Sequence, residues 1–260
     1  MQQLTRQHNP TFLAFKDAAA RALAETPSLV RLDCLNPVKA VAHAFDTSPV
    51  FHWRAPLPGP RLNSATHSEW SAPRLVGQWI FIGSAGGTAL YALSRRDGSV
   101  VREFPAGNSV ESAGEVAGDR VWFSDTGGVT FCNSRDGTRM WRHDGNAPVL
   151  VAPTLTEDRK LLVVTNVDDL AVALNADTGE LVWQYRGKRD LTRQAELTLY
   201  AAPRAEIVGD QVLLGFSSGT VAAVSRETGE EIWTRSVGEG RYPDVVAGPK
   251  ALGTDAFVSG

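Results

Sequence analysis

The stretch Ala173-Leu174-Asn175-Ala176-Asp177-Thr178-Gly179-Glu180-Leu181-Val182-Trp183 places a tight polar turn between two apolar segments. An aspartate side chain can accept hydrogen bonds from the backbone just ahead of it, and glycine adopts a positive φ without steric cost. Asp177-Thr178-Gly179 is therefore favourable in a turn. Because apolar residues flank it on both sides, the stretch predicts a β-hairpin whose second strand carries Trp183.

The same pattern occurs at three other places in the chain. Residues 221–233 keep the spacing in full, residues 131–141 have a turn that is one residue shorter, and residues 91–104 have Arg102 at the tryptophan position. The turn glycines are Gly98, Gly137, Gly179 and Gly229, so successive copies are 39, 42 and 50 residues apart. A period of roughly 40–50 residues with several strands per unit is typical of a β-propeller.

Each repeat opens with Ala-Pro or a related pair, and short apolar strands separated by turns follow. The opening pairs are Ala72-Pro73, Ala113-Gly114, Ala152-Pro153, Ala202-Pro203 and Gly248-Pro249. We therefore expect an all-β propeller of four-stranded blades over residues 49–260, with repeats at about 71–110, 111–149, 150–197 and 198–246 and a partial repeat at 247–260. Small residues in the third strands, such as Ala92, Ala173 and Ala223, fit close packing between blades.

Two segments precede the repeats. Residues 11–24 are rich in alanine and predict a short helix within an N-terminal extension, residues 1–48, that we otherwise expect to be weakly ordered. Residues 49–54 predict a lone strand, which in a closed propeller would complete the last blade from the other end of the chain. With four repeats and a partial fifth, we expect the propeller to be truncated.

Composition and charge narrow the functional classes. The 260 residues are 43% hydrophobic and 21% charged, with a formal net charge of −3. This balance is typical of a globular protein and lacks the basic footprint of a nucleic-acid-binding protein. No apolar run approaches the ~18 residues of a transmembrane helix. The first 30 residues do not show the pattern of a signal peptide, and Leu32-Asp33-Cys34 is a poor lipobox.

Patterns that could indicate catalysis or metal binding have simpler interpretations. Gly215-Phe216-Ser217-Ser218-Gly219 matches a nucleophile elbow, but the histidine of that triad follows the serine, and the last histidine here is His143. The segment 83–87 lacks the Lys-Ser/Thr ending of a phosphate loop. The histidines are scattered, Cys34 and Cys132 form no Cys-x-x-Cys motif, and Val167-Asp168-Asp169 is interpreted as an exposed acidic turn. The sequence therefore predicts no catalytic, cofactor-binding or metal-binding residue.

The repeat tryptophans are predicted to be structural. Trp53, Trp141, Trp183 and Trp233 recur at one position of the pattern. A large aromatic side chain that recurs once per repeat is suited to packing between neighbouring blades, where it buries a large apolar area.

The pattern A-x-N-x-D-T-G-E-x-x-W of Ala173–Trp183 resembles the tryptophan-docking repeat of the pyrroloquinoline-quinone-type (PQQ) β-propellers. Within that group, residues 50–260 are most similar to BamB-like outer-membrane assembly proteins. The resemblance implies a non-enzymatic scaffold without a cofactor, at the periplasmic face of the outer membrane of a Gram-negative bacterium. It also implies protein partners among the components of the outer-membrane β-barrel assembly machinery.

Two long connections between repeats are the candidate partner-binding segments. Insertions in repeat proteins map to one face, which is often the binding face, and arginine and tyrosine are enriched among interface hot spots. The resemblance assigns partner binding to an aspartate at position 244; the alternative interpretation is that these residues are solvated. The candidate residues are Arg189, Asp190, Arg193, Arg241, Tyr242 and Asp244.

Two other functions stay open at this point. One is a fragment of a PQQ-dependent dehydrogenase, a family that the resemblance associates with adjacent cysteines over the cofactor, calcium ligands and a catalytic aspartate. Cys34 and Cys132 are not adjacent. The other is an extracytoplasmic sensor propeller, which a kinase domain in the same reading frame would indicate.

Overall fold

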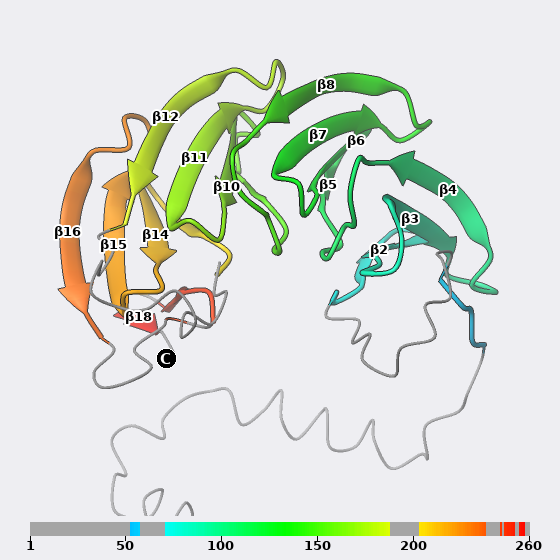
Figure 1. Ribbon diagram of the computed structural model, residues 1–260, viewed down its shortest axis with the longest axis horizontal. Helices are drawn as coiled ribbons and strands as arrows, with labels where there is room; N and C mark the ends of the chain where they lie inside the picture. The colour runs from blue at the N-terminus through cyan, green and yellow to red at the C-terminus, as the bar shows by residue number, and fades with distance from the viewer. Residues whose placement is uncertain are drawn as a thin grey trace, which may run out of the picture. The chain divides into compact units, whose positions relative to one another are not determined.

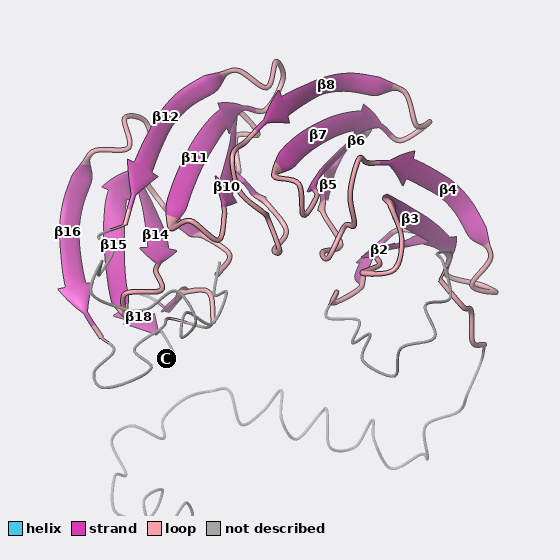
Figure 2. Ribbon diagram, in the orientation of Figure 1, coloured by secondary structure: helices cyan, strands magenta, loops and turns pink. Residues whose placement is uncertain are grey.

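The computed structural model of the chain describes residues 53–57, 71–187, 203–237, 245, 247–252 and 255–257. These residues belong to one unit, Trp53–Gly260. They contain strands and turns and no helix (Figure 2). The predicted N-terminal extension, with its helix at residues 11–24, lies outside the described residues.

Four antiparallel sheets of four strands follow one another along the chain (Figure 1). The first contains β1 (Arg74–Val76), β2 (Trp79–Gly83), β3 (Ala89–Ser94) and β4 (Val100–Pro105). The second contains β5 (Glu115–Ala117), β6 (Arg120–Ser124), β7 (Val129–Ser134) and β8 (Arg139–Asp144). The third contains β9 (Thr154–Leu155), β10 (Leu161–Thr165), β11 (Leu170–Asn175) and β12 (Leu181–Arg186). The fourth contains β13 (Glu206–Val208), β14 (Gln211–Gly215), β15 (Thr220–Ser225) and β16 (Glu231–Ser236).

The strands of each sheet pair in chain order, so every sheet is a four-stranded meander. The predicted all-β architecture of four-stranded units is confirmed. A further pair, β17 (Lys250–Leu252) and β18 (Asp255–Phe257), follows the fourth sheet. Trp53–Leu57 have no regular secondary structure, and the rest of the predicted strand at 49–54 lies outside the described residues. The repeat boundaries and the closure of a ring stay predictions.

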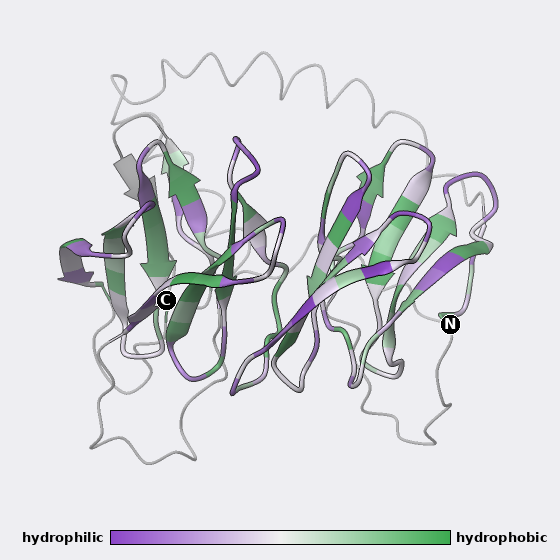
Figure 3. Cartoon of the chain, turned by 90° about the horizontal axis from the view of Figure 1, so that it is seen from above, coloured by the Kyte–Doolittle hydropathy of each residue, from purple (hydrophilic) through white to green (hydrophobic). Residues whose placement is uncertain are grey.

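The core lies between neighbouring sheets. One cluster of buried side chains joins the first two sheets around Phe81, Phe104 and Phe123, and similar clusters join the second to the third and the third to the fourth. Ala92, Ala173 and Ala223 on the third strands have no exposed surface. Figure 3 shows hydrophobic colour along these central strands and hydrophilic colour in many of the turns.

Neighbouring sheets also meet where the indole of Trp183 docks on the turn of the next sheet. Trp183 in β12 donates its Nε1–H to the carbonyl of Arg226 at 2.8 Å. Its ring covers Gly229, where a Cβ atom would lie 2.8 Å from the indole Cδ2. The Gly229 φ of 72° also favours glycine. We call this pairing of a ring on a glycine and an Nε1–H on a carbonyl the two-point docking contact.

The two-point docking contact recurs at two other tryptophans. Trp141 lies against Gly179 and donates to the Ala176 carbonyl at 3.1 Å. Trp53 lies against Gly98 and donates to the Arg95 carbonyl at 3.0 Å. In each case the carbonyl is three residues before the glycine. For Trp233 in β16, the described residues provide no such turn.

A β-bulge in each sheet aims the docking side chain. The register between the third and fourth strands shifts directly after Ala92, after Cys132, after Ala173 and after Ala223. These four residues pair with Arg102, Trp141, Trp183 and Trp233 respectively. Because a bulge locally increases strand twist and redirects a side chain, its repetition at this position fits the common role of the docking residue.

Arg102 occupies the docking position between the first and second sheets. The turn it meets is one residue shorter, since the Gly137 amide bonds the carbonyl three residues back, whereas the Gly98 amide bonds the carbonyl four residues back. In this turn, the carbonyl of Arg135 takes the position of the one that accepts the indole N–H elsewhere. It lies two residues before the glycine instead of three. The Arg102 Cδ atom lies 3.3 Å from the position of a Cβ atom on Gly137. An aliphatic stem therefore replaces the indole where the turn geometry differs.

We predict that Gly229→Ala destabilises the protein more than Gly209→Ala does. Both glycines have a positive φ, so alanine is strained by about 1 kcal/mol at either position. A Cβ atom at Gly209 meets nothing within 4 Å, whereas one at Gly229 meets the Trp183 ring. We expect an additional loss of about 1–3 kcal/mol at Gly229, measured by urea unfolding. Equal losses in the two variants would contradict the docking role of Trp183.

Candidate functional site

The loops of each sheet lie at two opposite ends of the strands. At one end, the turn between the first and second strands bonds the turn between the third and fourth, as in Ala176 N to Lys160 O and Arg226 N to Asp210 O. We call this the turn end. At the other end, the turn between the second and third strands bonds the connection that leads into the same sheet, as in Val167 N to Pro148 O. We call this the connection end.

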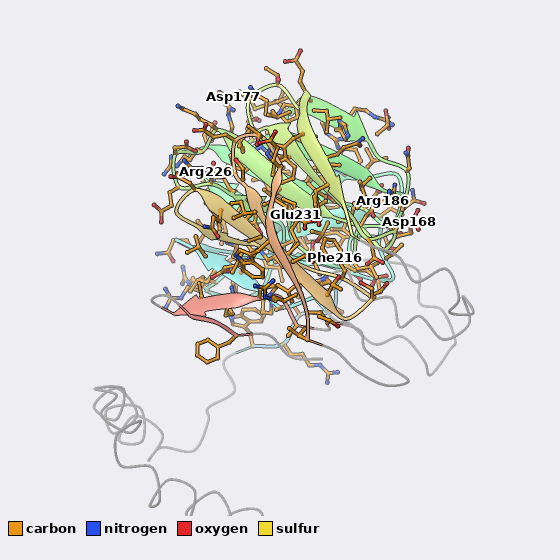
Figure 4. The ribbon with its side chains drawn as sticks, turned by 90° about the vertical axis from the view of Figure 1, so that its left-hand side faces the viewer. Asp168, Asp177, Arg186, Phe216, Arg226 and Glu231 are labelled. Atoms are coloured by element: carbon orange, nitrogen blue, oxygen red, sulfur yellow. The ribbon has the colours of Figure 1, made fainter. Side chains whose placement is uncertain are left out.

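Figure 4 shows labelled side chains of both ends on opposite sides of the third and fourth sheets: Asp177 and Arg226 at the turn end, Asp168, Arg186 and Phe216 at the connection end.

The described loops of the two ends differ in their number of charged residues. In the described loops of the connection end, the charged residues are Glu111, Asp125, Asp168, Asp169 and Arg204. Those of the turn end are Arg95, Arg96, Asp97, Asp119, Arg135, Asp136, Glu157, Asp158, Arg159, Lys160, Asp177, Glu180, Asp210, Arg226, Glu227 and Glu230. Protein interfaces are depleted of charged residues at their centre. Among the described loops, those of the connection end contain fewer charged residues than those of the turn end.

Two of the connection-end carboxylates have structural roles. Asp125 has no exposed surface and accepts hydrogen bonds from the amides of Gly107 and Asn108 in the connection and of Gly127 and Val129 in its own turn. Asp169 is also buried, and it ties the third sheet to the fourth through Ser217. Both groups shape the loops and present little charge to solvent.

Four side chains meet at the connection end, one from the start of the first strand of each sheet or from just before it. Arg74 donates to both oxygens of Glu115, at 2.7 Å to Oε2 and 2.5 Å to Oε1. Arg204 donates to Glu115 Oε2 at 2.6 Å and, through Nε, to Thr154 Oγ1 at 3.1 Å. The Glu115 side chain is 8% exposed, and those of Arg74 and Arg204 are 34% and 39% exposed. We call Arg74, Glu115, Thr154 and Arg204 the inner cluster.

A cavity of about 460 Å³ lies beside the inner cluster. It is formed by the ends of the connections rather than by one sheet, and Arg74, Glu111 and Arg204 are the charged residues that line it. The other lining residues are small or apolar: Ala72, Pro73, Ser112, Ala113, Gly114, Leu150, Val151 and Ala152. The geometry is that of a preformed recess whose lining includes two arginines.

The members of the inner cluster share one position in the repeat, and we did not single them out from the sequence. Arg74, Glu115, Thr154 and Arg204 each follow the opening pair of their repeat directly. Lys250 follows the fifth pair and forms an ion pair with Glu206 at 2.6 Å. The signal that could have identified the cluster is the charge at this position. The residues after the opening pairs begin, or come just before, the first strands of neighbouring sheets, so their side chains lie close together.

The Gly-x-Ser-x-Gly match is a hairpin turn between β14 and β15. Ser217 Oγ donates to Asp169 Oδ2 at 2.5 Å and its amide donates to Asp169 Oδ1 at 2.9 Å. The hydroxyl thus contacts a buried carboxylate of the neighbouring sheet, as a linking group would. Among the described residues, no group of three or more histidine, cysteine, aspartate or glutamate side chains could hold a metal ion.

Burial raises the pKa values of two titratable groups. Burial raises the pKa of the Cys132 thiol to about 12, and the side chain has no exposed surface. Burial, followed by the hydrogen bond to Glu231, also raises the pKa of the Tyr185 phenol. The Tyr185 hydroxyl donates to Glu231 at 2.6 Å and its ring contacts Phe216. Tyr185 therefore belongs to the contact between the third and fourth sheets.

The structure places three of the four repeat tryptophans at docking contacts, and the predicted partner-binding residues lie outside the described part of the chain. Trp53, Trp141 and Trp183 dock on the following turns, as described above. Arg189, Asp190, Arg193, Arg241, Tyr242 and Asp244 lie outside the described residues. The described part of the chain also contains no helix of the length and hydropathy that a membrane span requires.

The repeats and their sheets match a known family along most of the chain. A family model described as outer membrane protein assembly factor BamB matches residues 43–154 and 110–259. The chain belongs to this family. Its membership confirms that the docking repeats are of the PQQ-like type and most similar to BamB.

Curated relatives of the BamB type are distant and longer. BamB of Burkholderia pseudomallei is 25% identical over 192 residues, which cover 71% of this chain and 48% of that protein. The chain thus spans about half the length of this relative.

The quinoprotein alcohol dehydrogenase PedH of Pseudomonas putida is 27% identical over 137 residues, covering 48% of this chain and 22% of PedH.

Solved structures show the same fold. The crystal structure of BamB from Moraxella catarrhalis matches with a TM-score of 0.61 at 17% identity, covering 78% of this chain and 60% of that one. A quinohemoprotein alcohol dehydrogenase from Pseudomonas putida matches with a TM-score of 0.54 at 14% identity, covering 80% of this chain and 40% of that one. The fold is shared by assembly proteins and enzymes, so function depends on the site.

We predict that Glu115→Gln destabilises the protein by about 2 kcal/mol, because the substitution leaves Arg74 and Arg204 facing each other without the charge that both contact. Glu206→Gln is the matched control, since its partner Lys250 is 69% exposed and such pairs contribute less than about 1 kcal/mol. Denaturant unfolding of both variants measures the difference. A loss for Glu115→Gln no larger than that of the control would show that the inner cluster does not hold the sheets together.

We predict that Cys132 does not react with a thiol reagent at pH 8 in the folded protein. A pKa of about 12 leaves about one thiol in ten thousand ionised at that pH, and the side chain is also inaccessible. A Cys34→Ser variant isolates Cys132, and absorbance with Ellman's reagent measures the reaction before and after addition of urea. Rapid reaction without urea would contradict the burial of this thiol.

Proposed function

We propose that the chain is a protein-binding part of the outer-membrane β-barrel assembly machinery, acting without catalysis at the periplasmic face of the outer membrane. The observation that carries the proposal is the match to the BamB family model over residues 43–259. The proposed role is to hold partners in fixed positions. Sheets joined by docked tryptophans and buried clusters suit that role, because a rigid surface loses little entropy on binding.

The proposed docking surface is the connection end. Two carboxylates in its described loops are buried in hydrogen bonds to neighbouring loops, which fixes the shape of this surface. The sequence places the long connections that contain Arg189, Asp190, Arg193, Arg241, Tyr242 and Asp244 between a fourth strand and the next opening pair. Connections of this kind belong to the same end of the sheets, so we propose that these residues bind the partner.

A second candidate, a PQQ-dependent redox propeller, is supported by the similarity to PedH. The residues present do not fit the cofactor. Cys132 is buried with a raised pKa, and the sequence has no adjacent cysteines. The described residues also lack a cluster of carboxylates for a calcium ion. We therefore derive no redox step for this chain.

Co-purification with outer-membrane barrel assembly proteins tests the proposal. We expect the unsubstituted chain to bind, and Asp244→Ala and Arg241→Ala each to weaken binding about tenfold or more, as truncation of a hot-spot residue does. Arg96→Ala, an exposed arginine of the turn end, is the matched control and should bind normally. Normal binding by both connection variants would refute the assignment of these loops, and no binding by the unsubstituted chain would refute the scaffold.

A further inference from the structure

The two arginines of the inner cluster have more hydrogen-bond donors than the cluster uses. A guanidinium group has five N–H donors. Arg74 directs Nη1 and Nη2 to Glu115, with a long contact from Nη1 to the Gly114 carbonyl at 3.5 Å. Arg204 directs one N–H to Glu115 and one to Thr154. Both side chains are about one-third exposed and line the 460 Å³ cavity. Among the described residues, several N–H donors of these two arginines therefore have no acceptor.

The charges around the cavity are incompletely paired. Glu115 is shared by two arginines, so the inner cluster has one more positive than negative charge. Glu111 also lines the cavity and is half-buried, but it forms no ion pair with another described residue. Its carboxylate reduces the positive potential of the recess without occupying the guanidinium donors.

We propose that this cavity receives the carboxylate of an aspartate or glutamate side chain from a loop of a protein partner. The inference rests on the proposed scaffold function and names the chemistry of one contact within it. Arginine offers paired N–H donors in the fork geometry that matches a carboxylate. The small apolar residues around the arginines leave room for the adjoining backbone of the loop, and the volume exceeds the needs of a carboxylate alone. The cavity belongs to the connection end, where the partner is proposed to dock.

The first test uses blocked tripeptides as probes. Ac-Gly-Asp-Gly-NH₂ is titrated into the full chain, and the Nε–H signals of Arg74 and Arg204 are followed by NMR. We expect saturable shifts of both signals, and none with Ac-Gly-Asn-Gly-NH₂, which has the same shape without the charge. Equal shifts with both peptides, or none with the aspartate peptide, would overturn the proposal.

Substitutions at the cavity make the test independent of folding defects. Glu111→Gln removes the nearby negative charge without breaking an observed ion pair, so we expect about fivefold tighter binding of the aspartate peptide. Arg204→Lys keeps the charge but loses the fork and should bind several-fold more weakly. Unchanged affinity in Glu111→Gln would refute an electrostatic role of the cavity, whatever the stability of the arginine variant.

The same variants separate this inference from the proposed function. If the assembly partner binds Glu111→Gln and the unsubstituted chain equally well, the cavity contact is wrong while the scaffold proposal stands. If the aspartate peptide binds as expected but no assembly partner co-purifies, the scaffold proposal fails while the carboxylate site stands. Tighter partner binding by Glu111→Gln supports both.

Discussion

An indole ring that contacts a glycine and a carbonyl at the same time fixes how one sheet meets the next. The two-point docking contact needs a bulge to aim the ring, a glycine to make room for it, and a turn that holds the carbonyl three residues before that glycine. Burial of a tryptophan removes about 150–250 Å² from water. At ~25 cal/mol per Å² this corresponds to an upper value of about 4–6 kcal/mol at each contact. The direction of the Nε1–H then selects one orientation among those that would bury similar area.

Different kinds of interaction hold neighbouring sheets together at their two edges. At the fourth strands, Trp141 and Trp183 make aromatic and directional contacts. At the first strands, Arg74, Glu115 and Arg204 join the sheets by charge. Between these edges lie the aliphatic and aromatic clusters of the central strands. The surface at the connection end is therefore held in place by contacts at both edges of the sheets.

The sequence was sufficient for the local structure because the hairpin signal is local. The polar turn of Asp177-Thr178-Gly179 and the apolar segments around it lie within eleven residues. The other copies of the pattern supported the same assignment independently. The inner cluster could not be predicted in this way. Arg74 and Arg204 are 41 and 89 residues from Glu115 in the sequence, and their contact depends on how the sheets are placed around one another. Likewise, the repeat predicted that tryptophans pack between blades, but not that Trp53, Trp141 and Trp183 each dock on the turn between the third and fourth strands of the next sheet.

The short turn at Gly137 has a consequence for how such a protein can change over evolutionary time. Arg102 belongs to the first sheet, yet the turn beside it belongs to the second, and the two depart from the common pattern together. A duplication or recombination event that copied one sheet intact would separate a docking residue from the turn that suits it. A segment that runs from β4 through the turn at Gly137 keeps Arg102 together with the turn that it contacts. The unit that keeps a docking residue with its turn is therefore offset along the chain from the unit that forms one four-stranded sheet.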